Sequence, residues 1–275
     1  MMEYIYGNNI FLTGGSSGIG LAAAELLAAN GYTVYAASRA PSGDIRSFPG
    51  GGAIHPVAMD VRSLSSAEIA VNSVLSNADI GVVVHCAGIG IACAAEDFPQ
   101  DAIAGLMDTN FTGVMRVNSL VLPHLRKRGS GLCLIIGSVA GIFPVPFQSH
   151  YSASKAALDS YAAALRMELH EYGVRVCLVM PGDTNTGFTS ARKYFIAETS
   201  PFYDACVKAV GKMENDELGG RPPVSVAKTI LKIVSRIKPP ARIIVGFDYK
   251  LLAFLKRFLP DRLIEYILRK MYIGR

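Results

Sequence analysis

The sequence predicts an α/β fold built on one doubly wound parallel sheet, and two observations carry this prediction. Short apolar runs recur along the chain, each followed by apolar residues at helical spacing, which is the pattern of βαβ units. The runs Val82–Val84 and Leu134–Ile136 are continuously apolar, as strands covered on both faces are. The expected strands are Asn9–Thr13, Thr33–Ala37, Ala53–Met59, Ile80–Cys86, Leu132–Gly137, Val174–Val179 and Ala241–Val245.

The composition is that of an apolar globular protein. Hydrophobic residues make up 51% and charged residues 18% of the 275 positions, which excludes disordered, collagen-like and coiled-coil classes. No strong linker divides the chain, so we expect one domain over residues 1–247. Within it, residues 183–223 have weak helical patterning and contain the pairs Gly219-Gly220 and Pro222-Pro223. This is expected of a lid inserted before the last strand.

The cysteines and the N-terminus favour a reducing, cytoplasmic setting. The five cysteines form no Cys-x-x-Cys pair, which argues against a disulfide framework and a thiolate zinc site. The N-terminus lacks a basic stretch followed by a long apolar core, so it does not resemble a secretory signal. The five histidines are dispersed, and we therefore propose no metal.

The first predicted strand runs directly into a glycine-rich turn, Thr13–Gly20, which opens an apolar helix. Glycines let the backbone approach a ligand closely, and the free N–H groups at a helix N-terminus favour a pyrophosphate. The turn therefore predicts a dinucleotide cradle, the alternative being an ordinary strand-to-helix turn. The residues expected to contact the cofactor here are Gly14, Ser16, Ser17, Gly18, Ile19 and Gly20.

The second strand ends at Ser38 and Arg39, where an NAD enzyme usually carries an acidic residue for the ribose 2′-hydroxyl. A cation there suits a 2′-phosphate, so NADP is favoured over NAD. The alternative is a solvated surface arginine. Asp60-Val61 and Ala87-Gly88 follow the third and fourth strands and should flank the adenosine half, with Asp60 either accepting from the adenine amino group or capping the next segment.

A tyrosine and a lysine predict acid–base chemistry. Tyr151 and Lys155 are four residues apart in a predicted helix, which places both on one face. A fixed positive charge there should stabilise the phenolate and lower a tyrosine pKa that is about 10 in water. Ser138 follows the strand at Leu132–Gly137, where its hydroxyl could hold a carbonyl oxygen.

These motifs resemble those of the short-chain dehydrogenase/reductases, a Rossmann-like family, over nearly the whole chain up to Val245. The resemblance implies that Tyr151 exchanges the hydroxyl proton, Lys155 holds the nicotinamide ribose, Ser138 polarises the carbonyl and Asn110 anchors a relay water. It also implies that the loop Pro181-Gly182, with Thr184 and Thr186, passes the nicotinamide; alternatively these threonines cap a helix.

One position departs from the family pattern. His85-Cys86-Ala87-Gly88 stands where the family usually has Asn-Asn-Ala-Gly, which puts in doubt how this strand end is fixed. His85 is expected to be a satisfied strand histidine rather than a ligand.

Apolar residues around the presumed mouth favour a lipid-, steroid- or acyl-like carbonyl or alcohol as the substrate, although they could equally pack on the core. The residues are Ile89, Ile91, Ile142, Phe143, Pro144, Phe147, Phe188, Tyr194, Phe195, Phe202 and Tyr203. The combined predictions describe an NADPH-dependent carbonyl reductase, reversible as an alcohol dehydrogenase. The alternatives are a non-catalytic NADP-binding sensor or scaffold and a nucleotide-sugar epimerase. The family resemblance also implies a homodimer or homotetramer.

The basic character of the chain belongs to its end. The net charge is +5, yet residues 236–275 hold ten Lys/Arg against three Asp/Glu. We therefore expect no nucleic-acid partner, since binders of that kind are basic over a whole face. Residues 248–275 should form two amphipathic basic helices. They either contact a membrane surface peripherally or, as we favour, pack over the pocket or a second subunit.

Overall fold

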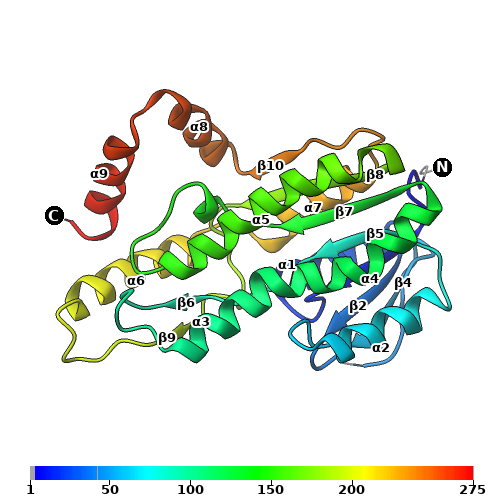
Figure 1. Ribbon diagram of the computed structural model, residues 1–275, viewed down its shortest axis with the longest axis horizontal. Coiled ribbons are helices and arrows are strands. Elements are labelled where there is room, and N and C mark those ends of the chain that lie inside the picture. The colour runs from blue at the N-terminus through cyan, green and yellow to red at the C-terminus, as the bar shows by residue number, and fades with distance from the viewer. Residues whose placement is uncertain (1–3, 42, 275) are drawn as a thin grey trace.

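The computed structural model describes residues 4–41 and 43–274, and its centre is an eight-stranded sheet with the strand order β10-β8-β7-β5-β1-β2-β4-β3 (Figure 1). All neighbouring strands are parallel except β3, which pairs antiparallel with β4. The strands are β1 Asn9–Thr13, β2 Thr33–Ser38, β3 Arg46–Ser47, β4 Ala53–Ala58, β5 Ile80–His85, β7 Gly131–Ile136, β8 Val174–Pro181 and β10 Arg242–Val245. The predicted α/β fold class is confirmed.

Helices cover both faces of the sheet. The α-helices of the described residues are α1 Gly18–Ala29, α2 Leu64–Leu75, α3 Gln100–Met107, α4 Gly113–Arg128, α5 Ser149–Glu168, α6 Tyr203–Leu218, α7 Pro223–Val234, α8 Phe247–Leu255 and α9 Asp261–Tyr272, of which α1, α2, α4, α5 and α7 cover the sheet. On one face α1 and α7 pack against Val82 and Val84, and on the other α2, α4 and α5 pack against Val83. Figure 1 shows α4 and α5 in front of the sheet. Every residue of β5 is therefore buried, which is why the run Val82–Val84 is continuously apolar.

The sequence did not reveal the short strands. β3 at the sheet edge has exposed residues only, and the two-residue strands β6 (Ile91–Ala92) and β9 (Lys193–Tyr194) form a separate small sheet. Two residues are too few to show an alternating pattern, so periodicity gives no signal for them. β9 and α6 both lie within residues 183–223, and the function of this segment as a lid stays a prediction.

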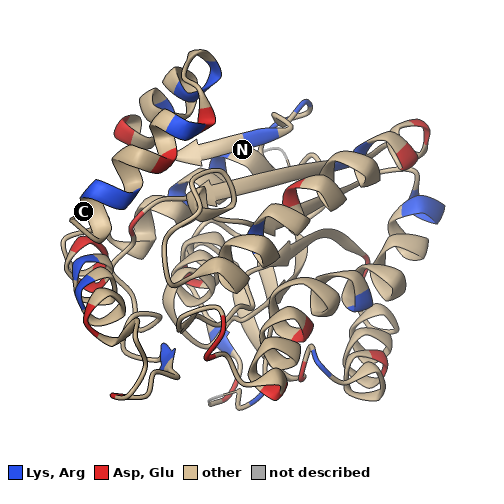
Figure 2. Ribbon diagram, turned by 60° about the vertical axis from the view of Figure 1, so that its left-hand side comes forward, with Lys and Arg blue, Asp and Glu red and all other residues tan. Residues whose placement is uncertain are grey.

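The chain ends in the two predicted helices, α8 and α9, which stand apart from the sheet (Figure 1) and carry several Lys and Arg residues (Figure 2). A short turn, η4 (Lys256–Phe258), joins them before Pro260. On α8 the Tyr249 hydroxyl bonds to the Asp183 carboxylate, and α9 packs on α6 through Tyr272. Within residues 4–41 and 43–274, no helix combines the length and apolar character that a membrane span requires.

The unusual strand end at His85 is fixed by a buried polar network. His85 is 2% exposed, and its Nε2 lies 2.8 Å from Asn118 Oδ1. The Asn118 amide in turn donates to the Tyr161 hydroxyl at 3.1 Å. Burial lowers the pKa of His85 to about 4, so the ring is neutral at pH 7. His85 is thus a strand histidine whose Nε2 has a protein partner, as predicted, whereas its buried Nδ1 has none among the described residues.

Replacing Asn118 with Ala should lower the free energy of unfolding by about 2–4 kcal/mol, because it leaves the buried His85 ring and the Tyr161 hydroxyl without this partner. Chemical denaturation measures the loss. Asn72→Ala on the exposed side of α2 is the matched control and should change stability by less than about 0.5 kcal/mol. Equal effects of the two substitutions would refute the network.

Candidate active site

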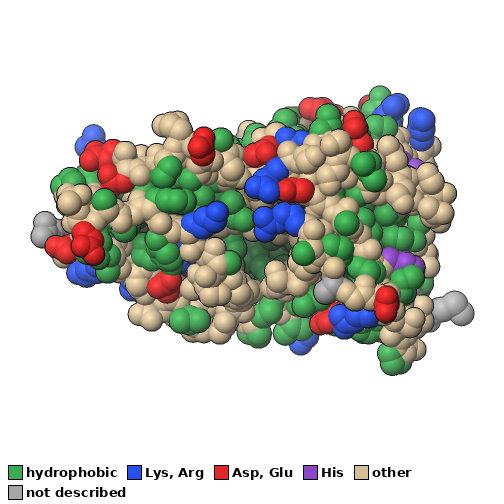
Figure 3. Space-filling model, turned by 90° about the horizontal axis from the view of Figure 1, so that it is seen from below, with side chains coloured by type: hydrophobic (Ala, Val, Ile, Leu, Met, Phe, Trp, Pro, Cys, Tyr) green, Lys and Arg blue, Asp and Glu red, His purple; other side chains and the backbone are tan. Residues whose placement is uncertain are grey.

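One large cavity lies at the carboxyl ends of the central strands, where open α/β sheets bind their ligands. Its volume is about 1300 Å³. Figure 3 shows a hollow in the surface with hydrophobic side chains in its depth and Lys and Arg side chains beside it. Of the predicted site residues, only Asn110 does not line the cavity. The others do: Gly14, Ser16, Ser17, Gly18, Ile19, Gly20, Ser38, Arg39, Asp60, Val61, Ala87, Gly88, Ser138, Tyr151, Lys155, Pro181, Gly182, Thr184 and Thr186.

The glycine-rich turn between β1 and α1 forms the floor of one end of this cavity. Gly14 has φ +73°, and a Cβ there would lie 2.7 Å from the Ala87 backbone nitrogen. A Cβ on Gly20 would lie 2.1 Å from the Gly14 carbonyl oxygen. Both positions therefore exclude a side chain, and the α1 N-terminus at Gly18 opens toward the cavity with its N–H groups free for an anion.

Two arginines line the cavity beyond the carboxyl ends of β2 and β4. Arg39 is exposed and lines the wall, and the Ser38 hydroxyl beside it is buried without a hydrogen-bond partner. Arg62, which the sequence analysis missed, lines the same wall and pairs with Asp60 at 2.6 Å. Ser63 caps α2, whereas the Asp60 carboxylate accepts from the Arg62 backbone N–H at 3.0 Å, which is the turn role predicted as its alternative, and from the Arg62 side chain. A bond from adenine to Asp60 stays a prediction.

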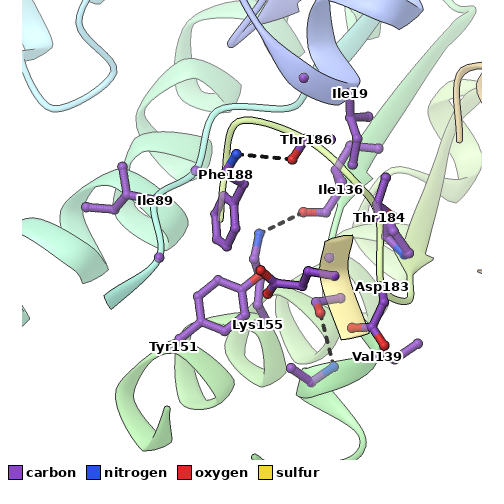
Figure 4. Close-up of a pocket in the computed structure, with 18 of the residues that line it drawn as sticks. Ile19, Ile89, Ile136, Val139, Tyr151, Lys155, Asp183, Thr184, Thr186 and Phe188 are labelled. Atoms are coloured by element: carbon purple, nitrogen blue, oxygen red, sulfur yellow. Dashed lines mark hydrogen bonds between the residues drawn. The ribbon is translucent and has the colours of Figure 1, made fainter. Parts of the chain in front are cut away.

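The catalytic pair comes from the first turns of α5. Lys155 is 6% exposed, and its Nζ donates to the carbonyl oxygen of Ile136 at 3.1 Å, two residues before Ser138. The same Nζ lies 5.7 Å from the centre of the Tyr151 ring. Figure 4 shows Tyr151 and Lys155 extending from α5 into the same part of the cavity, with Phe188 opposite. The predicted juxtaposition of phenol and amine on one helix face is therefore confirmed.

The electrostatics of this pair differ from the prediction. Burial raises the pKa of Tyr151 to about 12, although a hydrogen bond with Ser138 acts in the opposite direction. We predicted a lowered pKa, and this was wrong, because Lys155 directs its ammonium to a strand carbonyl and desolvation of the phenolate dominates. Burial also lowers the pKa of Lys155 to about 8. At pH 7 the tyrosine is thus protonated and the lysine charged.

Asn110 lies outside the wall of the cavity. It is fully buried in a π-helical turn, η1 (Asp108–Thr112), between α3 and α4. Its side chain accepts from the Ile89 N–H at 2.8 Å and donates to the Ile89 carbonyl at 3.0 Å and the Ser154 hydroxyl at 3.2 Å. The amide therefore holds the segment after β5 in place. Its role as a water anchor stays a prediction.

The loop after β8 lines the cavity with Thr184 and Thr186, and its passage along the nicotinamide stays a prediction. The Thr184 hydroxyl donates to the Gly182 carbonyl, and the Thr186 hydroxyl accepts from the Phe188 N–H at 3.2 Å. Neither threonine caps a helix, since α6 begins only at Tyr203. The hydroxyls instead shape the loop that faces the glycine turn.

The substrate side is lined by a different apolar set from the one predicted. Of the predicted residues, only Ile89, Phe143 and Phe188 line the cavity. Ile91 is buried in a small cluster, while Tyr194 and Phe202 are exposed. The C-terminal helices contribute most of the wall instead, with Leu252, Leu255, Leu259, Ile264, Ile267, Leu268, Met271 and Tyr272. Packing of the tail over the pocket, one of the two alternatives, is therefore what the structure shows.

Comparison with known proteins gives the family. The family model described as short chain dehydrogenase matches residues 8–195. The chain belongs to the short-chain dehydrogenase/reductase family. It is 36% identical over 270 residues to the 3-ketodihydrosphingosine reductase of Bacteroides thetaiotaomicron, covering 97% of this chain and 98% of that protein.

Two further relatives agree. Retinol dehydrogenase 8 of Bos taurus is 30% identical over 270 residues, with 92% of this chain and 86% of that protein covered. The crystal structure of a short-chain dehydrogenase from Streptomyces avermitilis superposes with a TM-score of 0.78 at 26% identity, covering 98% of each chain. The chain is therefore an NAD(P)-dependent oxidoreductase with a single-domain fold of this family.

The cavity fits a nicotinamide dinucleotide. The absence of side chains at Gly14 and Gly20 lets the turn pack closely on itself and on the end of β5 at the cavity, and the orphaned Ser38 hydroxyl needs a polar partner. Free N–H groups at the α1 N-terminus complement a pyrophosphate, and Lys155 stands where it can donate to a ribose hydroxyl.

The burial of Lys155 has a measurable cost. Its pKa falls from 10.5 to about 8 on folding, so the unfolded chain binds more protons between these pH values and the charge destabilises the fold below pH 8. Lys155→Met should therefore raise the free energy of unfolding at pH 7 by about 2 kcal/mol, after allowance for the lost bond to Ile136. The gain should shrink as the pH rises from 8 to 10.5.

Urea denaturation at pH 7 and at pH 10 tests this, with the exposed Lys127→Met as the control. A gain that is absent at pH 7, or that is the same at both pH values, would contradict the assignment.

Proposed function

We propose that this protein reduces the ketone or aldehyde of a long, lipid-like substrate to an alcohol, reversibly and with NADPH. The observation that carries the proposal is the placement of Tyr151, Lys155 and Ser138 inside a cavity whose far wall is built from the aliphatic side chains of α8 and α9. An apolar pocket with a few convergent polar groups suits a largely hydrophobic molecule with one reactive carbonyl.

Tyr151, Ser138 and Lys155 each have a different role at the carbonyl oxygen of the substrate. The Tyr151 hydroxyl, protonated at pH 7 because its pKa is about 12, donates its proton to the carbonyl oxygen as that oxygen gains charge. The Ser138 hydroxyl holds the same oxygen, and the Lys155 ammonium, charged below its pKa of about 8, offsets the phenolate left behind. A bound nicotinamide dinucleotide supplies the hydride that reaches the carbonyl carbon, so one hydride and one proton complete the alcohol.

The names of the relatives support a lipid-like substrate. One is named for 3-ketodihydrosphingosine, a long-chain ketone, and the other for retinol. Both match this chain over more than nine-tenths of its length. The apolar wall described above is the feature of this chain that such a substrate needs.

The preference for NADPH is supported by the charges near β2. Arg39 and Arg62 lie on the same wall, and the Asp60 carboxylate is occupied by Arg62. The hydrogen bond from Arg62 holds the pKa of Asp60 below its usual value, and the charge of Arg39 adds to this effect. The wall thus presents net positive charge beside the buried Ser38 hydroxyl, a setting that favours a 2′-phosphate over a free 2′-hydroxyl.

Two further properties are kept as proposals. We infer a cytoplasmic location from the free cysteines. We infer a homodimer or homotetramer from the family. Light scattering on the purified full chain measures the second of these directly.

Tyr151→Phe should lower kcat by about 10²–10⁴-fold, because general acid catalysis contributes that much and the ring is otherwise kept. NADPH binding, followed by fluorescence titration, should change little. Tyr194→Phe is the control, since that tyrosine is exposed and does not line the cavity. Unchanged turnover in Tyr151→Phe would defeat the acid–base assignment.

Arg39→Ala should raise the KM for NADPH by roughly 10–100-fold and leave the KM for NADH nearly constant, because only the 2′-phosphate loses a charge-assisted hydrogen bond. Steady-state kinetics with both cofactors gives the ratio. Arg46→Ala is the control, as Arg46 pairs with Glu25 away from the cavity. A parallel change for the two cofactors would show that Arg39 does not read the phosphate.

A further inference from the structure

The C-terminal helices carry an unusual concentration of exposed apolar side chains. In the part of the chain that the structure describes, 24 large hydrophobic side chains are exposed, and 11 of these lie between Phe247 and Met271. Some of them line the cavity mouth, but six do not, and these six define the outer face of the tail. The outer face consists of Phe247, Leu251, Phe254, Phe258, Leu263 and Tyr266.

The spacing makes this face continuous along each helix. Phe247, Leu251, Phe254 and Phe258 recur at intervals of four, three and four, which places them on one side of α8 and its η4 extension. The Phe254 and Phe258 rings are in contact, with their centres 5.3 Å apart. Phe247 and Phe258 are 79% and 71% exposed, so nothing in the described chain covers either end of the stripe.

Cations surround the outer face. Lys250, Arg257, Arg262, Arg269 and Lys270 form no ion pair with any residue that the structure describes. Arg269 and Lys270 lie over the Tyr266 ring at 5.7 and 5.8 Å. The acidic residues of the two helices are fewer, and Asp248 is already paired with Arg221. An apolar stripe bordered by uncompensated cations complements an anionic, partly apolar surface.

The other side of the same helices forms the substrate cavity. Leu252 and Leu255 of α8 and Ile264 and Leu268 of α9 line it. A surface in contact with the outer face would therefore lie next to the exposed residues of the cavity mouth, which belong to the same helices. A water-insoluble substrate could then pass between that surface and the site without crossing bulk water.

We propose that the outer face of α8 and α9 docks on an anionic lipid bilayer, from which the substrate enters the cavity. The choice of a bilayer rests on charge: a second copy of the chain would bring the same five cations toward one another, whereas an anionic leaflet neutralises them. The link to substrate entry rests on the proposed function, but docking itself does not.

Vesicle sedimentation with the full chain tests docking directly. Phosphatidylcholine vesicles with phosphatidylglycerol should bind the protein, and salt should weaken the binding, whereas phosphatidylcholine alone should bind it poorly. Arg257→Glu/Arg262→Glu should lower the partition coefficient by roughly 30-fold or more, and Phe254→Ser/Phe258→Ser by roughly tenfold or more. None of these four residues lines the cavity.

Matched controls separate the face from a general loss of charge or apolar surface. Lys127→Glu/Lys228→Glu and Ile69→Ser/Met167→Ser change exposed residues elsewhere and should bind vesicles like the unmodified chain. Equal binding of all variants, or equal binding to both kinds of vesicle, would overturn the proposal. So would light scattering in which only the outer-face variants dissociate an oligomer while none binds vesicles, because the face would then be a contact between copies.

Activity on a water-soluble ketone distinguishes this proposal from the proposed function. The outer-face variants should reduce such a ketone at the normal rate and lose rate only on a lipid ketone presented in vesicles. Vesicle binding without reduction of any ketone would remove the proposed function and leave docking intact. Normal reduction of the lipid ketone by the outer-face variants would overturn the role of the face in substrate entry.

Discussion

The site depends on one buried contact, the hydrogen bond from the Lys155 ammonium to the Ile136 carbonyl at the end of β7. It joins the first turns of α5 to the end of β7. Ser138 lies two residues beyond that carbonyl, and Tyr151 lies one helical turn before the lysine. The bond thus links the strand that precedes Ser138 with the helix that carries Tyr151. The two hydroxyl groups line the same cavity although they are 13 residues apart in the sequence.

The same arrangement explains why the charges are perturbed. Desolvation opposes both the phenolate and the ammonium, so Tyr151 holds its proton more tightly and Lys155 less tightly than in water. The protonated Tyr151 is the form that the proposed reduction uses. The polar end of the cavity therefore suits the acid chemistry of a reductase, and the apolar end, built from α8 and α9, suits a substrate with a long hydrocarbon part.

Most of the sheet and the polar site could be predicted from sequence, because each rests on local pattern. Continuous valines mark β5, and the glycines of Thr13–Gly20 mark a turn that excludes side chains. Properties that depend on distant neighbours could not be predicted. The pairing of Arg62 with Asp60, the hold of Asn110 on Ile89 and the raised pKa of Tyr151 all arise from three-dimensional packing. Most of the apolar residues expected at the cavity mouth do not line the cavity, for the same reason. Apolar character alone does not distinguish a residue of the cavity wall from a residue of the protein core.

Transfer of deuterium from NADPH that carries deuterium at both C4 positions to a long-chain ketone tests the central claim most directly. Mass spectrometry of the product should show one deuterium on the carbinol carbon for the unmodified chain, with one cofactor oxidised for each alcohol formed. Cofactor oxidation without deuterium in the product, or no consumption of any long-chain ketone by a folded protein that binds NADPH, would contradict the account.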